Sequence, residues 1–144
     1  MKSLFLFFLI VGIILIGTIA EGADWILLGE NNIGTSYYDR ASIKQLSEDV
    51  VKVSVKYAYS SEGVEKFREA FPRVNRSEMV AYTLYIYDIN CSKGSFRLIK
   101  AITYNSAGSA ISGTELRFNE SQQSTPEHIT PHSIMEQLSK VSCR

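Results

Sequence analysis

Two histidines and their acidic neighbours are the first residues whose types and spacing suggest chemistry. His128 and His132 are four positions apart, with Glu127 and Glu136 close by, and two histidines at this spacing on one helix can bind zinc. Pro131 lies between them, however, and proline disfavours helix in the residue before it. The pair is therefore predicted to straddle a helix start with both imidazoles solvated, and we expect no metal and no cofactor.

No other group of side chains matches a known catalytic arrangement. The serines do not occur in a Gly-x-Ser-x-Gly sequence, and no glycine-rich phosphate loop follows a predicted strand. Asp39 is of the type that stabilises turns. Asp88, inside a tyrosine-rich strand, must be solvated or paired, and Arg97 is the expected partner. The sequence thus predicts no catalytic residue, and a hydrolase or metal-dependent enzyme is the least favoured function.

Tyrosines and arginines make a better case for binding. All eight tyrosines fall in or beside predicted strands, and tyrosine combines apolar contact area with a polar tip, as interfaces favour. Tyr85 and Tyr87, in the longest strand, are candidate partner-binding residues, although alternate tyrosines can equally cover a core. Arg73 and Arg76 follow the acidic residues of a predicted helix, so they are candidates to meet an anionic partner. A solvated helix surface is the simpler alternative for this region.

The overall composition indicates one ordinary folded domain. Of the 144 residues, 45% are hydrophobic and 21% are charged, and fifteen basic residues balance fifteen acidic ones. Disorder requires lower hydrophobicity and a larger net charge, and nucleic-acid binding usually shows a basic excess, so neither is predicted. A chain of this length holds a single hydrophobic core.

The first twenty residues (1–20) are predicted to be a cleaved signal peptide. Lys2 precedes a long apolar run, and small residues then lead to Ala20, which is the order found in secretory signals. Cleavage is expected after Ala20, with Ala23 as a second site, and an uncleaved membrane anchor is the alternative. No cysteine follows the run, so a lipid anchor is not expected, and residues 21–144 form the predicted domain.

The two cysteines are predicted to form a disulfide. Export would place the domain in an oxidising compartment, where two lone cysteines most simply form a bond, here between Cys91 and Cys143. The bond would close a loop of roughly 50 residues, which the chain-entropy model equates to about 4 kcal/mol of stability. Free thiols or an intermolecular bridge are the alternatives.

The hydrophobic pattern predicts mostly β-strands. Residues 50–60 alternate, with three valines and two tyrosines facing one way and Lys52, Ser54 and Lys56 facing the other. Further strands are predicted over residues 24–29, 35–40, 79–90, 95–104 and 109–118. Their short connections favour antiparallel pairing, because parallel strands need long crossovers.

Two short helices complete the predicted elements. Residues 61–71 carry apolar side chains at helical spacing, with Ser60 or Ser61 as the cap and a proline as the stop. Near the C-terminus, Thr130 offers a cap and Pro131 the first helical position, and one apolar stripe follows. A helix of about eleven residues is marginal alone, so it must pack on the sheet. The predicted fold is α+β, an antiparallel sheet of five or six strands with a disulfide-tethered C-terminal helix packed on one face.

The order of residues along the chain also resembles that of a known family. The residues that carry the resemblance are Trp25, Gly29, Tyr38-Asp39, Ser42-Ile43, Tyr82, Tyr85, Asp88-Ile89-Asn90-Cys91, Phe96-Arg97, Tyr104, Gly108, Pro131-His132-Ser133, Leu138 and Cys143. Together they resemble the surface-adhesin protein E family of bacterial envelope proteins, over essentially the whole of residues 21–144. The cysteine pair and its neighbours are the most specific part of the resemblance.

The resemblance implies both a fold and a biological setting. It implies an antiparallel sheet whose C-terminal helix is held by a disulfide, and a non-enzymatic role at the bacterial surface or in the periplasm. The namesake of the family binds host matrix and serum proteins, so a protein partner is expected here, for an adhesin-like module. The second function is a structural or accessory component of a cell-envelope assembly, and a homodimer is compatible with both.

The leader bears on where such a protein would act. The namesake is a lipoprotein, whereas this chain has no lipidation cysteine after its apolar run. A periplasmic, secreted or cell-surface location is therefore expected, with membrane contact only through an uncleaved leader. The namesake's ligand-contacting segment has no matching motif in this chain, so the resemblance assigns no binding residue.

Overall fold

The computed structural model describes residues 22–117 and 124–144. The predicted leader, and the last residue of the strand predicted over 109–118, lie outside these described residues. The elements, in chain order, are strands β1 (Trp25–Asn31), β2 (Gly34–Gln45) and β3 (Val50–Tyr59), helix α2 (Ser61–Ala70), strands β4 (Val80–Asn90), β5 (Ser95–Asn105), β6 (Leu116–Arg117) and β7 (Glu127–His128), and helix α3 (Ile134–Ser142).

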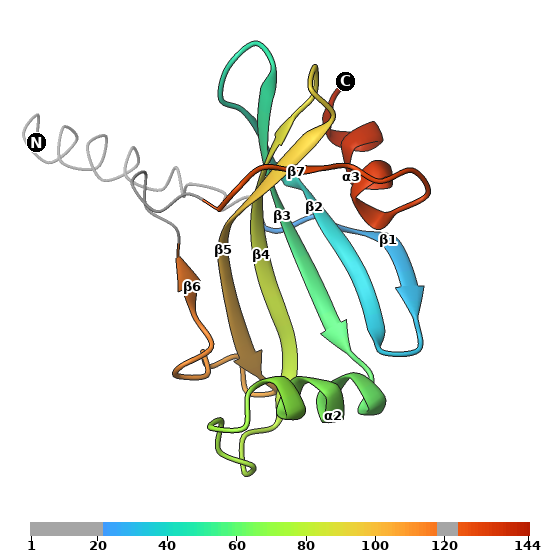
Figure 1. The fold of residues 1–144 in the computed structure, drawn as a ribbon. Coiled ribbons are helices and arrows are strands. Elements are labelled where there is room, and N and C mark those ends of the chain that lie inside the picture. Colours follow the sequence, from blue (N-terminus) through green and yellow to red (C-terminus); the bar gives the residue numbers. More distant parts are fainter. Residues whose placement is uncertain (1–21, 118–123) are drawn as a thin grey trace, which may run out of the picture.

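All the strands belong to one antiparallel sheet (Figure 1). Its order is β1-β2-β3-β4-β5-β6, and β7 pairs with β5 near the β4–β5 turn. From β1 to β6, strands that follow one another in sequence are therefore paired neighbours in the sheet, as the short connections predicted. The sheet has seven strands, one more than the six predicted, because the two-residue strand β7 is too short to leave a periodic pattern.

Strand β3 at the centre defines the two faces of the sheet. Val51, Val53 and Val55 are buried, while the residues between them are half-exposed, which confirms the alternation predicted from the sequence. We call the face that carries these valines the inner face and the opposite one the outer face. In an antiparallel pair, directly opposed residues share a face. The register therefore shows which residues of each neighbouring strand lie on the inner face and which lie on the outer face.

Helix α3 packs on one end of the inner face. Leu138 is completely buried and joins a core cluster with Val53 and Ile89. The predicted disulfide is present, and it links Cys91, just after β4, to Cys143, just after α3. The C-terminal helix is thus held by an apolar contact and a covalent bond together, as expected.

Helix α2 lies at the opposite end of the sheet (Figure 1). It begins as predicted, because the Ser60 hydroxyl accepts a hydrogen bond from the Gly63 amide and caps the first turn. Phe67 points into a second buried cluster with Val80 and Ile111. Gly63 lies against the turn between β1 and β2, where a β-carbon would stand 1.9 Å from the Ile33 carbonyl oxygen.

The C-terminal helix starts later than the prediction of Thr130 as cap and Pro131 as first residue. Ser133 is the cap, since its hydroxyl accepts from the Glu136 amide, and the Glu136 carboxylate accepts from the His132 amide. The sequence Ser-x-x-Glu is that of the capping box, but here the glutamate accepts from the residue before the cap, since the Ser133 amide donates to the Thr130 carbonyl. His132 takes a left-handed conformation with φ 63°, which places it in the turn before the helix.

The strand predicted over 109–118 was wrong in extent. Only Leu116 and Arg117 form β6, and Ala110 makes a single bridge to Tyr104. Between them Ile111 turns inward to fill the cluster under α2, and the Thr114 hydroxyl donates to its carbonyl.

Neither helix of the described residues is long and apolar enough to cross a membrane.

Breaking the disulfide should release α3 before the rest of the fold. The double variant Cys91→Ser/Cys143→Ser should lose about 2–5 kcal/mol of stability, as is typical for a native disulfide in a small exported domain. Hydrogen exchange should then quicken first in residues 134–144, while β3 and β4 stay protected, because their pairing does not need the bond. Equal protection of α3 in oxidised, reduced and variant protein would contradict the tether.

The close approach of α2 to the β1–β2 turn makes Gly63 a second test of the fold. Gly63→Ala should destabilise the protein by about 1–3 kcal/mol, because the new methyl meets a backbone carbonyl that cannot rotate away. Gly29→Ala is the matched control, since its methyl would meet only the flexible end of Ile134. Urea unfolding should show the larger loss for Gly63→Ala, and equal losses would refute this packing.

Candidate functional site

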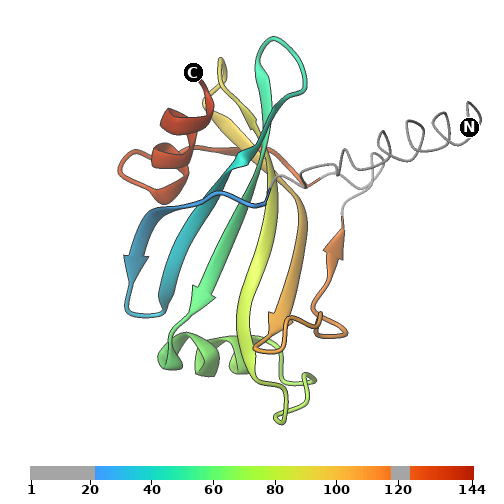
Figure 2. The same cartoon turned by 180° about the vertical axis from the view of Figure 1, so that it is seen from behind.

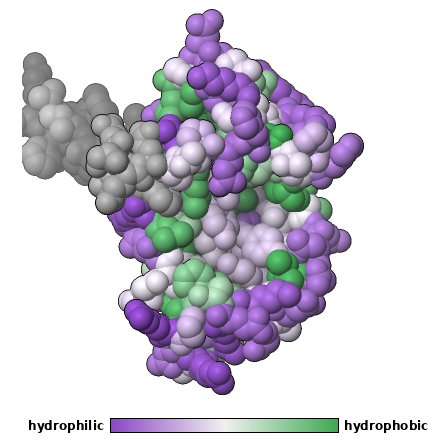
Figure 3. Space-filling view, in the orientation of Figure 1, coloured by the Kyte–Doolittle hydropathy of each residue, from purple (hydrophilic) through white to green (hydrophobic). Residues whose placement is uncertain are grey.

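The middle of the inner face is lined by tyrosines from the two central strands. Tyr57 and Tyr59 come from β3, and Tyr85 and Tyr87 come from β4. The first pair meets edge to face with ring centroids 5.2 Å apart, and the second pair stacks at 5.8 Å. All four are half-buried, and a pale, recessed band is visible between the two ends of this face (Figure 3).

A network of hydroxyl groups forms the floor beneath these rings. The Tyr59 hydroxyl lies 2.8 Å from the Thr83 hydroxyl, which in turn lies 2.8 Å from that of Thr103. Interactions with the side chains of Tyr59 and Thr83 also influence the pKa of Tyr85. Both threonines are almost fully buried, at 3% and 2% exposure. Their hydroxyls are satisfied by one another, so a polar floor separates the apolar clusters under the two helices.

Burial shifts the titration of four tyrosines on this face to higher pH. It raises the pKa values of Tyr57, Tyr59 and Tyr85 above the ordinary value of 10.0. The pKa of Tyr87 rises to about 12, through burial first and the nearby Glu127 carboxylate second. The hydroxyls of these four tyrosines therefore stay protonated from neutral pH into the alkaline range and can both donate and accept a hydrogen bond.

The structure does not bring the four candidate partner-binding residues together. Tyr85 and Tyr87 lie on the inner face and also pack against the core cluster under α3, so they serve the core and the surface at once. Arg73 and Arg76 are exposed in the loop after α2. Arg73 lines a hollow of about 520 Å³ with Phe71, whereas Arg76 lines another of about 370 Å³ with acidic residues of α2. The two arginines thus border different hollows.

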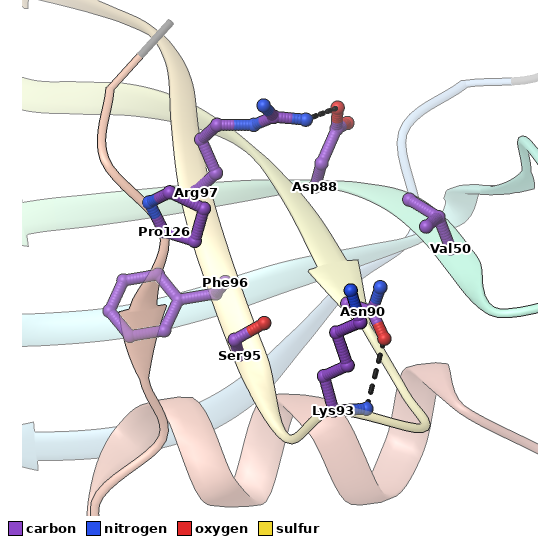
Figure 4. Close-up of a pocket in the computed structure, with 8 residues that line it drawn as sticks. All are labelled: Val50, Asp88, Asn90, Lys93, Ser95, Phe96, Arg97 and Pro126. Atoms are coloured by element: carbon purple, nitrogen blue, oxygen red, sulfur yellow. Dashed lines mark hydrogen bonds and ion pairs between the residues drawn. The ribbon is translucent and has the colours of Figure 1, made fainter.

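Asp88 pairs with basic residues on the outer face, as the sequence indicated. It lies opposite Lys52 on β3 and Arg97 on β5, and its carboxylate oxygens are 3.8 Å and 4.0 Å from their side-chain nitrogens. Arg97, Asp88 and Lys93 border a small hollow of about 150 Å³ near the β4–β5 turn (Figure 4). The Lys93 amide donates to the Asn90 side chain, so these groups hold the turn and the strand pairing in place.

The remaining candidates for chemistry have structural surroundings. Asp39 accepts hydrogen bonds from the backbone amides of Asp24 and Ala41, as expected of a turn-stabilising aspartate. His128 lies on β7 and His132 in the turn before α3, and both are exposed. Within residues 22–117 and 124–144, no three histidine, cysteine or acidic side chains come together as a metal site.

Two features of the inner face were not singled out by sequence reasoning. Tyr57 and Tyr59 were assigned to the alternating strand without a binding role, and Thr83 and Thr103 were not considered. The register explains why, since Tyr57 opposes Thr83 and Thr83 opposes Thr103 across three strands. A row of hydroxyls across a sheet can be found from sequence only once the strand register is known.

These observations define the class of protein. It is a small α+β domain in which two helices cover the two ends of one sheet face and leave an aromatic, hydroxyl-rich band between them (Figure 3).

Comparison with known proteins assigns the family. The model of the surface-adhesin protein E family matches residues 25–144, so this chain belongs to that family. The resemblance noted from its cysteines and tyrosines is confirmed, and the description of the family suggests a surface adhesin. No curated protein and no solved structure shows significant similarity to the chain.

The raised tyrosine pKa values make stability depend on alkaline pH. Tyr87 holds its proton more tightly in the fold, with a pKa of about 12 against 10.0, so this contribution to stability is complete below pH 10. The free energy of unfolding should fall as pH rises from 10 towards 12. Urea unfolding measured across this pH range should show a smaller decrease in the free energy of unfolding for Tyr87→Phe than for the unmodified protein. An identical decrease in both proteins would exclude this role for Tyr87.

Proposed function

We propose that this protein is an exported, non-enzymatic binding module of the bacterial envelope, and that the tyrosine band of its inner face contacts a protein partner. The observation that carries the proposal is the arrangement of Tyr57, Tyr85 and Tyr87 as half-buried rings between two helices. The family supports it, since its description, surface-adhesin protein E, suggests an adhesin at the cell surface.

The chemistry of the band suits a polypeptide. Tyrosine rings offer large contact areas while losing little side-chain freedom, and tyrosine is enriched in protein interfaces. The neutral hydroxyls around Tyr59 and Tyr85 can pair with the backbone groups of a bound segment. The packing of these rings against the core cluster holds them in place before a partner arrives.

Arg73 and Arg76 extend this proposal to the α2 end of the molecule. Both are exposed, and the hollow beside Arg73 is lined by Phe71, Pro72 and Val74. An apolar hollow with a guanidinium at its border suits an apolar side chain next to an acidic one. We assign the arginines a secondary contact with acidic groups of the partner.

Export through the predicted signal peptide is part of the same proposal. A leader cleaved after Ala20 would leave residues 21–144 in the periplasm, in the medium or at the cell surface, and the disulfide between Cys91 and Cys143 fits an oxidising compartment.

Photo-crosslinking from the two sheet faces tests the partner face. A benzoylphenylalanine at position 87 should give a reproducible adduct with a specific envelope or host matrix protein, and Tyr87→Ala should weaken that complex at least tenfold. The same group at Tyr82, on the outer face, is the matched control. Equal adducts from both positions, or none from folded protein at position 87, would contradict the proposal. A single stoichiometric envelope neighbour at position 87 would identify an accessory subunit in place of a free adhesin.

A further inference from the structure

No helix of the described residues covers the outer face of the sheet (Figure 2), and this face carries a row of mainly apolar side chains. Across β1 to β5 the register places in one row the side chains of Leu27, Tyr37, Lys56, Leu84 and Ile102. Tyr82 and Tyr104 stack beside this row with ring centroids 5.1 Å apart. Leu27 is 59% exposed, and the others of the row are partly exposed.

Basic side chains lie within this apolar surface. Lys56 stands in the middle of the row, and Lys100 lies opposite Ile86 in the next row. Towards the β4–β5 turn, Lys52 and Arg97 share the single carboxylate of Asp88. The centre of the outer face therefore carries an excess of positive charge on a chain whose net charge is zero.

The edge of this surface at β1 is aromatic. The Lys56 ammonium lies 4.6 Å from the centre of the Trp25 ring and 5.3 Å from that of Tyr37. Tryptophan and tyrosine beside lysine form the combination that is enriched where proteins meet the boundary between water and lipid.

The same features argue against a second protein as the occupant of the outer face. Lysine is depleted from the centres of protein interfaces, yet Lys56 and Lys100 lie inside the apolar surface. The hollow bordered by Leu84, Ile86 and Ile102 measures only about 90 Å³, whereas protein hot spots fill well-packed pockets. At a bilayer surface, by contrast, lysine stems lie along apolar surface while their ammonium groups reach the headgroups.

We propose that the outer face docks on an anionic phospholipid bilayer. Leu84, Ile86 and Ile102 would contact the lipid, Lys56 and Lys100 the phosphates, and Trp25 the boundary between them. Sequence reasoning expected membrane contact only through an uncleaved leader, whereas this contact uses the folded domain. It also leaves the inner face, with its tyrosine band, pointing away from the membrane.

Vesicle binding followed by tryptophan fluorescence tests this proposal, because Trp25 is the single tryptophan of the chain. The exported protein is titrated with vesicles of phosphatidylglycerol and phosphatidylcholine in equal amounts, and with vesicles of phosphatidylcholine alone. The mixed vesicles should shift the Trp25 emission to shorter wavelength and protect it from iodide quenching. Phosphatidylcholine alone should do neither, and added salt should weaken the binding.

Charge-matched variants test whether vesicle binding depends on the lysines of this face or only on the net charge of the protein. The double variant Lys56→Gln/Lys100→Gln should lower the affinity for the mixed vesicles by about thirtyfold, because each substitution removes one positive charge that faces the lipid. Lys66→Gln/Lys140→Gln removes the same charge from α2 and α3 and should bind like the unmodified protein. If the first variant does not fold, Lys100→Gln alone should lower binding by about fivefold.

Three results would overturn the proposal. The first is equal binding to both kinds of vesicle, and the second is equal loss in the two charge variants. The third is a Trp25 shift that follows protein concentration without lipid, which would show that a second copy of the chain occupies the face. Because the crosslinking experiment probes the inner face, its failure and the failure of vesicle binding are distinguishable.

Discussion

The short length of the two helices is the constraint on which the rest of this structure depends. At 1.5 Å per residue, the nine residues of α3 reach only about 14 Å, whereas the eleven residues of β4 extend over about 36 Å. One such helix cannot cover the inner face of the sheet. The chain meets this constraint with α3 at one end and α2 at the other, each over its own buried cluster.

The stretch between the helices must therefore be stable without a cover. Purely apolar side chains there would expose a sticky surface. Tyrosines resolve the conflict because each combines an apolar ring with a polar hydroxyl. The rings of Tyr85 and Tyr87 pack against the cluster that contains Val53 and Val55, and the Tyr59 hydroxyl bonds to Thr83. The result is a surface that is ordered and neutral, and this is why the same residues suit both the core and a partner.

The disulfide supports helix α3 at its end of the inner face. Leu138 anchors α3 from within, but a helix of this length is marginal without tertiary support. The bond from Cys91 to Cys143 fixes the end of the helix to the end of β4. It thereby keeps the apolar cluster covered in the compartment for which the leader is predicted.

Much of the fold could be predicted because its signals are local. The alternation from Val51 to Val55, the cap at Ser60 and the pairing of Asp88 with Arg97 follow from spacing and from the cost of an unpaired buried charge. The start of α3 was missed because Pro131 was weighed above the Ser133–Glu136 capping box, although both signals are present in the sequence.

The rest depends on contacts that no local pattern encodes. The segment after Ala110 leaves the sheet because the Ile111 side chain packs into the cluster under α2. Only the tertiary structure shows that this cluster has room for another apolar side chain. The hydroxyl floor likewise needs the register of three strands, and the separation of Arg73 and Arg76 from Tyr85 and Tyr87 needs the positions of both helices.

The central claim is that the two faces of one sheet have separate roles, the inner face towards a partner and the outer face towards the membrane. Oxidative footprinting with mass spectrometry tests it most directly, on the protein in isolated envelopes and on the same protein free in solution. The account predicts that Trp25 and Tyr104 are protected in envelopes while Tyr57 and Tyr87 react as they do in solution, until a partner is added and protects them. Equal reactivity of Trp25 in both samples, or protection of the inner tyrosines by the envelope alone with Trp25 reactive, would contradict it.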